Sequence, residues 1–465
     1  MTAVAVVGAG PIGMTMALSL ARYGVPSVLL DEDEQTTCEG SRSICVQRAT
    51  LEAFDRLGVG EPMAGEGVTW TCGRTYYRGT ELFEVRFPDR GRERFPPFVN
   101  LSQERVEQIL LERVEAEPLV EMRWRSRVAG AGQDADGVTL ELEHGGEVRA
   151  PYAVACDGPH STLRKLCGLR FPGHGHDDRF LIADIKARLP FPPERRFYFD
   201  PPHNPGRQVL LHPQPDDVWR IDWQVPPEVD ADDERRSGRL DERIRAIVGD
   251  APYEILWVTG YTFHQRMLRS FRAGCIFFAG DAAHVMAPFG ARGMNSGVQD
   301  AENLAWKLWG VLEGWAPEAL LDTYDTERRA AAAHNLRIVD ETMRFMIPPT
   351  RPRRLLRNAL LRASQYVRPL RRLVNSGRLS EPFVYRESPI VLGGGERVDV
   401  QGRGFVALVR DAVERPKTRV PLELRRRGDG PSGEGLVLVR PDGHVAARSD
   451  DTSRLRELLE LAVAA

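Results

Sequence analysis

The sequence is poor in two residue types, cysteine and lysine. Its six cysteines include no Cys-x-x-Cys pair and no metal-ligand spacing, and none follows Cys275. A chain of 465 residues can bury a large core without disulfides, so we expect a reducing, cytoplasmic setting and no metal site. Only four of the 63 basic residues are lysines, and a coding bias explains this as well as any function does.

The chain also has little excess charge. A formal net charge of −3, with 28% charged and 42% hydrophobic residues, is typical of an ordinary globular protein. No charge precedes Arg22, but glycines and Pro11 break this apolar run and the basic start of a signal peptide is missing. We therefore expect neither a nucleic acid nor a membrane as partner.

The first stretch, "AVAVVGAGPIGMTMALSLARYG", carries a dinucleotide-binding fingerprint. A β-branched run meets Gly8, Gly10 and Gly13, and a helical pattern follows. The first glycine permits a tight turn, the second lets the backbone approach a pyrophosphate, and the third lets the helix pack on the strand. The start of that helix offers N–H groups and a positive dipole end to phosphates.

A second predicted strand, "VPSVLLDEDE", ends in two acids about 20 residues further on. Asp31 or Glu32 would accept a hydrogen bond from a ribose hydroxyl, which favours FAD or NAD over NADP at this site. Asp33 and Glu34 are compatible with a solvated acidic cluster. The one other G-x-G-x-x-G, at 428–433, is not followed by a helical pattern, so we expect no separate nicotinamide-binding domain.

A third stretch, "GDAAHVMAPFGARGMNSG" at 280–297, follows the apolar run "CIFFA". A strand ending in Gly280 would let the backbone approach a ligand, and Asp281 would accept from a sugar-like hydroxyl. The loop that follows contains Pro288, Gly290 and Gly293, where side chains would obstruct a ligand. A helix expected from about residue 295 would favour negative charge at its start.

Together, "GAGPIG", "VACDGPHSTLRKLCGL" at 154–169 and "FFAGDAAHVMAPFGARGMNSGVQDAENLAWKL" at 277–308 resemble the three signatures of the p-hydroxybenzoate-hydroxylase-like FAD monooxygenases. Their order and spacing match over almost the whole chain. The resemblance is strongest to the phenol, 3-(3-hydroxyphenyl)propionate and aromatic polyketide hydroxylase branch.

The resemblance implies an α/β (α+β) fold with a glutathione-reductase-like Rossmann FAD-binding domain, an inserted β-sheet substrate domain and a shortened thioredoxin-like C-terminal domain. The last domain has no cysteine, which leaves a structural or dimer-forming role and a possible homodimer as the expectation. The implied boundaries are 1–67, 100–174 and 266–388 for the FAD-binding domain, 68–99 and 175–265 for the substrate domain, and 389–465 for the C-terminal domain.

The resemblance also implies residue roles. Asp281 would hold a ribityl hydroxyl of FAD, Gln103 would contact the ribityl chain, and Arg42 would lie near the flavin and pyrophosphate. Asp157 with Gly158 would lie near the pyrophosphate and the nicotinamide route. A solvated arginine and a helix-surface glutamine are the alternatives for Arg42 and Gln103. The full set of expected FAD contacts is Gly8, Gly10, Pro11, Ile12, Gly13, Asp31, Glu32, Arg42, Gln103, Val128, Asp157, Gly158, Asp281, Pro288, Gly290, Arg292, Gly293, Met294 and Asn295.

The third signature departs from the family's P-x-G-G-Q-G at two positions, Ala291 and Arg292. Ala291 fits the loop if its φ is negative. Arg292 lies either at the flavin edge or in solvent. We expect His284 to be structural and assign no catalytic base.

Two regions outside the signatures carry weaker signals. Residues 68–87 predict two strands around Arg78-Gly79-Thr80, and alternation in "VWRIDWQV" at 218–225 separates an aromatic face from a polar one. The aromatic face is either sheet packing or a pocket wall. Substrate candidates are Tyr198, His212, Arg220 and Trp223. The arginine-rich, acid-free segment 351–379 favours a docked helix over a membrane or nucleic-acid surface.

The implied reaction is a single-component hydroxylation. NADH or NADPH would reduce FAD, O₂ would add at the flavin C4a, and the hydroperoxide would hydroxylate a phenolic or polyketide-type ring. Baeyer–Villiger oxidation or epoxidation with the same cofactor, a flavin oxidoreductase without oxygen insertion, and a non-catalytic binding protein remain as alternatives.

Overall fold

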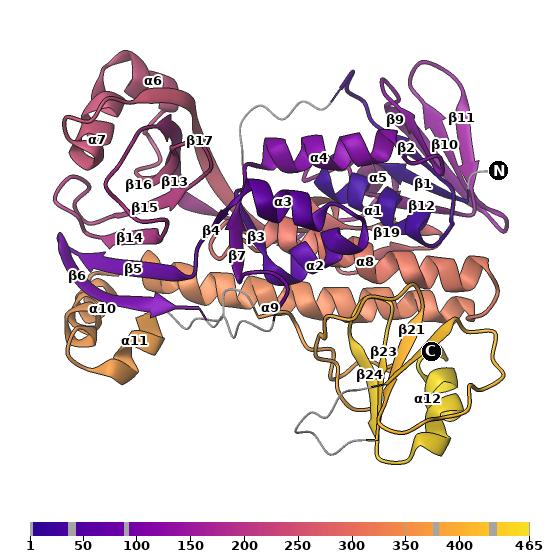
Figure 1. Ribbon diagram of the computed structural model, residues 1–465. Helices are drawn as coiled ribbons and strands as arrows, with labels where there is room; N and C mark the ends of the chain where they lie inside the picture. Colours follow the sequence, from indigo (N-terminus) through magenta and orange to yellow (C-terminus); the bar gives the residue numbers. More distant parts are fainter. Residues whose placement is uncertain are drawn as a thin grey trace.

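The computed structural model describes residues 3–35, 43–87, 93–348, 350–374, 381–426 and 435–464. Figure 1 shows three groups of elements: a central sheet with helices, a second sheet on the left, and a small C-terminal sheet below right. The long helix α9 (Asp322–Met346) runs beneath the first two groups and reaches the third.

The central sheet has six strands in the order β18-β19-β12-β1-β2-β8. All neighbours are parallel except the edge pair β18–β19. Parallel strands covered on both faces are apolar throughout, and β1 is buried along its whole length. The bounds are β1 (Val4–Val7), β2 (Ser27–Leu30), β8 (Val120–Arg123), β12 (Tyr152–Ala155), β18 (Arg272–Ala273) and β19 (Ile276–Phe278).

The predicted strand–helix–strand unit at the N-terminus is confirmed: β1, α1 (Pro11–Arg22) and β2 follow one another. Gly13 is required for this packing, since a Cβ atom there would lie 1.8 Å from the Gly8 carbonyl oxygen. The other helices of this part are α2 (Arg48–Arg56), α3 (Gly60–Glu66), α4 (Gln103–Glu115), α5 (Thr162–Leu166), η1 (Gly280–Ala282), α8 (Gly293–Leu312) and η2 (Glu318–Leu321).

Two three-stranded sheets flank the central one. Their strands are β3 (Cys45–Gln47), β7 (Phe98–Asn100) and β4 (Val68–Thr69) in one, and β11 (Glu147–Ala150), β10 (Gly137–Leu142) and β9 (Val128–Asp134) in the other.

The second large sheet has eight strands in the order β20-β17-β13-β16-β15-β14-β5-β6. The predicted hairpin is present, and its turn residues Arg78 and Gly79 have φ of 52° and 84°, as a tight two-residue turn requires. The bounds are β5 (Cys72–Tyr77), β6 (Thr80–Arg86), β13 (Gly173–Lys186), β14 (Arg195–Phe199), β15 (Gln208–Pro213), β16 (Val218–Val225), β17 (Glu254–Met267) and β20 (His284–Val285).

Helices pack on both faces of this sheet. One apolar face packs on α7 (Arg239–Val248), which follows α6 (Ala231–Arg236), through side chains such as Trp223 and Ile244. The arginine-rich segment forms α10 (Arg351–Ser364) and α11 (Arg368–Val374); α10 docks on β6 and buries Leu361. Among the described residues, no helix is both long and apolar enough to cross a membrane.

The C-terminal part is a four-stranded sheet, β22-β21-β23-β24, followed by α12 (Leu455–Leu461). Asp451 caps the short helix η4 (Thr452–Arg454), which directly precedes the last helix. The strand bounds are β21 (Phe405–Val409), β22 (Leu422–Arg426), β23 (Leu436–Val439) and β24 (Val445–Ser449).

A buried cluster of charges joins this sheet to the central part. Glu327 of α9 accepts from Lys307 Nζ of α8 at 2.7 Å and from Arg440 Nη1 at 2.5 Å. Asp442 accepts from Arg440 as well, and none of these four side chains is more than 2% exposed. Glu327 is therefore the anion that Lys307 and Arg440 share where the two parts meet.

Replacing Glu327 with alanine should lower the free energy of unfolding by about 3–5 kcal/mol, because two buried cations lose their shared anion. Chemical denaturation followed by tryptophan fluorescence measures the change. Glu457→Ala, which removes a half-exposed ion pair with Arg454, is the control and should change stability by less than about 1 kcal/mol. Equal effects of the two variants would contradict the assigned role of the cluster.

Candidate active site

One cavity of about 1570 Å³ lies between the carboxyl ends of the central strands and one face of the eight-stranded sheet. Residues after β1, β2, β12 and β19 line one end of it. Residues of β13, β14, β15, β16 and β17 line the other end, and α9 closes the side with Ile338, Thr342 and Phe345. In open α/β sheets, ligands bind at the carboxyl ends of the strands.

The glycine-rich turn and the second strand meet at the first end of this cavity. The Ala9 N–H donates to Asp31 Oδ2 at 2.5 Å, and this bond ties the ends of β1 and β2 together. A Cβ atom built on Gly10 would have no protein atom within 4 Å, although Gly10 lines the cavity. Its missing side chain therefore leaves room for a ligand rather than for the fold.

The residues at this end fit a dinucleotide with anionic groups. In the described residues, neither α1 nor α8 has a side-chain cap, and Pro11 and Gly293 at their starts line the cavity. Uncapped helix starts carry N–H groups and partial positive charge suited to phosphate or another anion. Asp157 Oδ2 accepts from the Thr162 N–H at 2.7 Å, whereas its buried Oδ1 has no protein partner there.

The loop of the third signature is held from behind by Asn295. Its Nδ2 donates to the carbonyls of Cys45 at 2.9 Å and Ala291 at 2.6 Å, and its Oδ1 accepts from the Gln47 N–H at 2.9 Å. Gln47 Nε2 in turn donates to the Gly290 carbonyl at 3.2 Å. Strand β3 thereby fixes the loop, while Asn295 itself lies behind the cavity wall.

The structure corrects one sequence expectation about this loop, at Ala291, and decides between two alternatives at Arg292. Ala291 has φ of 52°, in the left-handed region, so the condition of a negative φ is wrong. Asn295 Nδ2 and Gln47 Nε2, which donate to carbonyls of the loop, hold it in that conformation against a strain of about 1–2 kcal/mol. Arg292 is 5% exposed and donates to Asn335 Oδ1 at 2.5 Å, so it lies beside the cavity rather than in solvent.

His284 is fully buried behind this loop and shares a hydrogen bond of 2.7 Å between its Nε2 and Asp300 Oδ2. Asp300 also accepts from the Gly280 N–H at 3.0 Å and from Arg328 Nε at 2.6 Å. Burial alone would raise the pKa of Asp300, but His284 and Arg328 outweigh burial and lower it. His284 therefore supports the turn that carries Asp281.

The structure brings most of the expected FAD contacts together. Gly13 and Asn295 instead support the lining from behind, and Arg42 lies outside the described residues. Those that line the cavity are Gly8, Gly10, Pro11, Ile12, Asp31, Glu32, Gln103, Val128, Asp157, Gly158, Asp281, Pro288, Gly290, Arg292, Gly293 and Met294.

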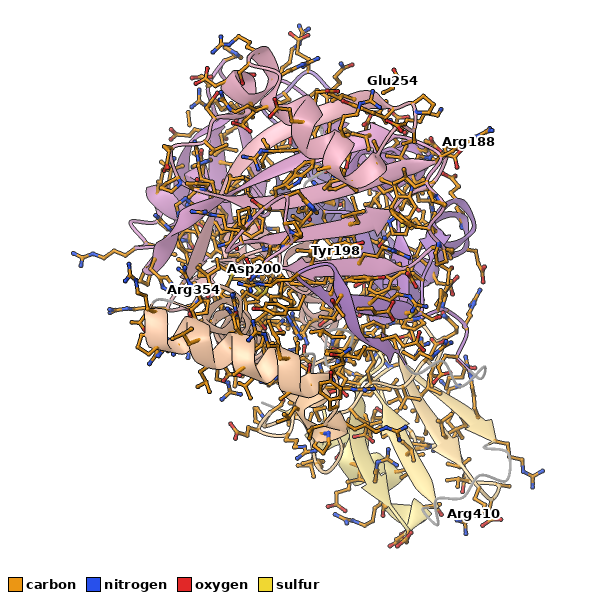
Figure 2. The ribbon with its side chains drawn as sticks, turned by 90° about the vertical axis from the view of Figure 1, so that its left-hand side faces the viewer. Arg188, Tyr198, Asp200, Glu254, Arg354 and Arg410 are labelled. Carbon is orange, nitrogen blue, oxygen red and sulfur yellow. The ribbon has the colours of Figure 1, made fainter. Side chains whose placement is uncertain are left out.

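The eight-stranded sheet separates the four substrate candidates. His212 and Arg220 line the cavity. Trp223 is fully buried in the apolar core against α7, because alternation along β16 points it to the opposite face from Arg220. Tyr198 stacks on Tyr76 with ring centroids 4.5 Å apart, and Figure 2 shows it on the sheet face turned away from the central sheet.

Sequence reasoning left out two ionisable residues of the sheet face at the substrate end, Arg195 and Asp222. Alternation in "VWRIDWQV" already places Asp222 on the polar face with Arg220, so the pattern contained a signal for Asp222. Arg195 follows a proline-rich turn and has no comparable signal. Only the pairing of β14 with β15 brings it beside His212.

Burial changes the proton affinity of the groups at this end. It raises the pKa of Asp222 to about 7, despite the opposing effect of Arg220. It lowers the pKa of His212 to about 3, with Arg195 and Arg220 adding to the effect. The imidazole of His212 is therefore neutral at physiological pH.

Gly10→Ala should leave the stability of the protein unchanged and weaken FAD binding by about tenfold or more, since its methyl group enters only the ligand space. Gly13→Ala should instead destabilise the fold, given its 1.8 Å contact with the Gly8 carbonyl oxygen. Fluorescence titration with FAD and thermal unfolding separate these effects. Gly65→Ala, an open position on α3 outside the cavity, is the control, and loss of stability in Gly10→Ala would contradict the assignment.

Comparison with known proteins places this site in a family. An FAD-binding-domain family model matches residues 1–339. The chain is 31% identical over 392 residues to the 3-(3-hydroxy-phenyl)propionate/3-hydroxycinnamic acid hydroxylase of Mycobacterium sp. (strain JLS), covering 84% of this chain and 68% of that protein. It is 30% identical over 477 residues to the rifampicin monooxygenase of Streptomyces venezuelae, covering 97% and 96%.

Among solved structures, the rebeccamycin biosynthetic enzyme RebC with reduced flavin superimposes with a TM-score of 0.78 at 27% identity over 99% of this chain and 98% of RebC. The family model and the full-length similarity agree with the resemblance in the three signatures. The chain therefore belongs to the FAD-dependent aromatic monooxygenases.

Proposed function

We propose that the chain is a single-component monooxygenase that takes electrons from NADH or NADPH and hydroxylates a phenolic or polyketide-type aromatic substrate. The observation that carries this proposal is that one cavity spans both ends: one end has dinucleotide-binding features and the other is an aromatic, partly polar sheet face. A cofactor and an aromatic molecule can meet in it without leaving the protein.

The residues of the first end would hold FAD. Asp31 and Glu32 lie at the end of β2 for the ribose, the starts of α1 and α8 are suited to anionic groups, and Asp281 lies where a ribityl hydroxyl would be accepted. When bound, FAD supplies the redox chemistry: it accepts hydride from the nicotinamide and activates O₂ for transfer of one oxygen atom to the ring. The protein's part is to bind, orient and exclude water.

The chain's own residues would keep the reaction site dry. Phe289 of the third signature packs edge-on against Phe180 and Phe263 of the sheet, with ring centroids 5.4 Å and 5.7 Å away. These three aromatic rings surround the place where the cofactor end and the substrate end of the cavity meet. A water-poor junction strengthens electrostatic interactions and limits side reactions.

The names of the relatives suggest the substrate class. One relative is named for a hydroxyphenylpropionate and a hydroxycinnamic acid, and another for rifampicin, a much larger molecule. A phenolic ring is the feature we carry over to this chain. Use of the nicotinamide without a domain of its own is supported by the single dinucleotide fingerprint of the sequence.

The test is a purified protein with bound FAD, screened with phenols for stimulated NADH or NADPH consumption. Mass spectrometry should detect a product heavier by one oxygen atom. Stimulated consumption that yields only hydrogen peroxide with every phenol would contradict the hydroxylase proposal and favour an oxidoreductase without oxygen insertion.

Asp281→Ala should raise the FAD dissociation constant by about tenfold or more, because a hydrogen bond from the cofactor to a charged acceptor is lost. Equilibrium dialysis or fluorescence titration of the apoprotein measures the constant. Asp136→Ala, at a carboxylate that is 87% exposed on the β9–β10 turn, serves as the control. An unchanged FAD affinity in Asp281→Ala would remove Asp281 from the cofactor site.

A further inference from the structure

The sheet face at the substrate end is ordered in rows across neighbouring strands. The register aligns Phe197 of β14, Leu210 of β15, Asp222 of β16 and Ile182 of β13. Thr75 and Thr259 extend the row at its two ends, and all six residues line the cavity. Asp222 is thus the one ionisable side chain in an otherwise neutral row.

Asp222 lacks the partners that a buried carboxylate normally has. Its Oδ1 is buried and forms no hydrogen bond within the described residues. The neighbouring Arg220 is paired with another carboxylate: its Nε and Nη2 donate to the two oxygens of Asp184 at 2.8 Å and 2.7 Å. A half-buried carboxyl group without a partner is costly to the fold, so it indicates a role towards a ligand.

The next row contains a cation, Arg195, that has no anionic partner within the described residues. It runs from Arg195 through His212 and Arg220 to Asp184, and the last two neutralise each other. Arg195 has no ion pair within the described part of the chain, its Nε is buried without a hydrogen bond, and its guanidinium lies 5.9 Å from the ring of Trp70. It is therefore a positive charge that faces the same cavity as Asp222.

From this juxtaposition we propose that Asp222 is the base that takes the hydroxyl proton of a phenolic substrate, and that Arg195 stabilises the resulting anion. The inference rests on the proposed function and adds the ionisation step to it. The phenol O–H bond breaks, the proton moves to a carboxylate oxygen of Asp222, and the electron pair stays on the phenol oxygen. Ionisation makes the ring more electron-rich and so easier to hydroxylate.

Other groups around Asp222 are compatible with this role. Arg220 and Asp184 form a closed pair, and His212 is neutral because burial lowers its pKa to about 3. Across the cavity, Glu341 of α9 and Arg292 also line the wall. Arg195 and Asp222 are two strands apart, about 10 Å at the backbone, so a ring can lie between their side chains.

Burial raises the pKa of Asp222 to about 7, so its carboxylate is available as a base from neutral pH upwards. A phenolate can bind next to Asp222 only when that group carries the proton. At alkaline pH, binding a phenolate must therefore take up one proton.

The test measures the dissociation constant of 4-nitrophenol, a coloured phenol, with the FAD-loaded protein over a range of alkaline pH. At pH values above the pKa of Asp222 and that of 4-nitrophenol, the dissociation constant should rise by about tenfold per pH unit, because binding takes up one proton. The absorption band should show that the bound ligand is the phenolate. In Asp222→Asn the constant should become independent of pH in the same range.

Arg195→Met should weaken phenolate binding by about tenfold or more at every pH while keeping the proton uptake. Asp232→Asn on the exposed helix α6 is the control and should behave as the unmodified protein. With a phenol that is hydroxylated, the rate should rise with pH through about 7, and Asp222→Asn should lose this rise.

The proposal is overturned if the unmodified protein binds 4-nitrophenolate without proton uptake, if Asp222→Asn keeps the pH dependence, or if the FAD-loaded protein does not bind 4-nitrophenol at all. The first and third measurements use the unmodified protein, so they decide even if a variant fails to fold. Binding is measured without NADH or NADPH, so a missing hydroxylated product would count against the proposed function alone.

Discussion

The carboxylate of Asp300 in α8 holds the centre of the molecule together. It accepts from the Gly280 N–H, from His284 and from Arg328, all within 3.0 Å and all buried. Arg328 continues the connection to the Tyr385 hydroxyl at 2.6 Å and the Ser296 carbonyl at 3.1 Å. One carboxylate therefore fixes the turn after β19, the N-terminal half of α8 and the first third of α9 relative to one another.

The site depends on this arrangement because its two ends belong to different sheets. The turn after β19 carries Asp281, and the loop before α8 carries the side chains that meet the eight-stranded sheet. If the turn and α8 were not fixed together, the cofactor end and the substrate end would not share one cavity. A buried carboxylate is costly to desolvate, but loss of its cationic partner Arg328 would cost more, which makes the arrangement specific.

A large part of the fold follows from local patterns in the sequence. The N-terminal strand, helix and second strand were predictable because glycine spacing and apolar runs are local constraints. The Arg78-Gly79 hairpin was predictable for the same reason. The family resemblance, carried by three short stretches, added the cofactor and the reaction class, which the comparisons with known proteins support.

The sequence by itself determined the FAD-binding unit and the alternation that gives β16 one aromatic and one polar face. The tertiary structure decided which face meets the cavity: α7 covers Trp223, so Arg220 and Asp222 point to the ligand space. It also decided the left-handed Ala291, the burial of Arg292 and the position of Arg195 beside His212. These features arise from contacts between residues far apart in the chain, and periodicity along one strand carries no information about what packs against it.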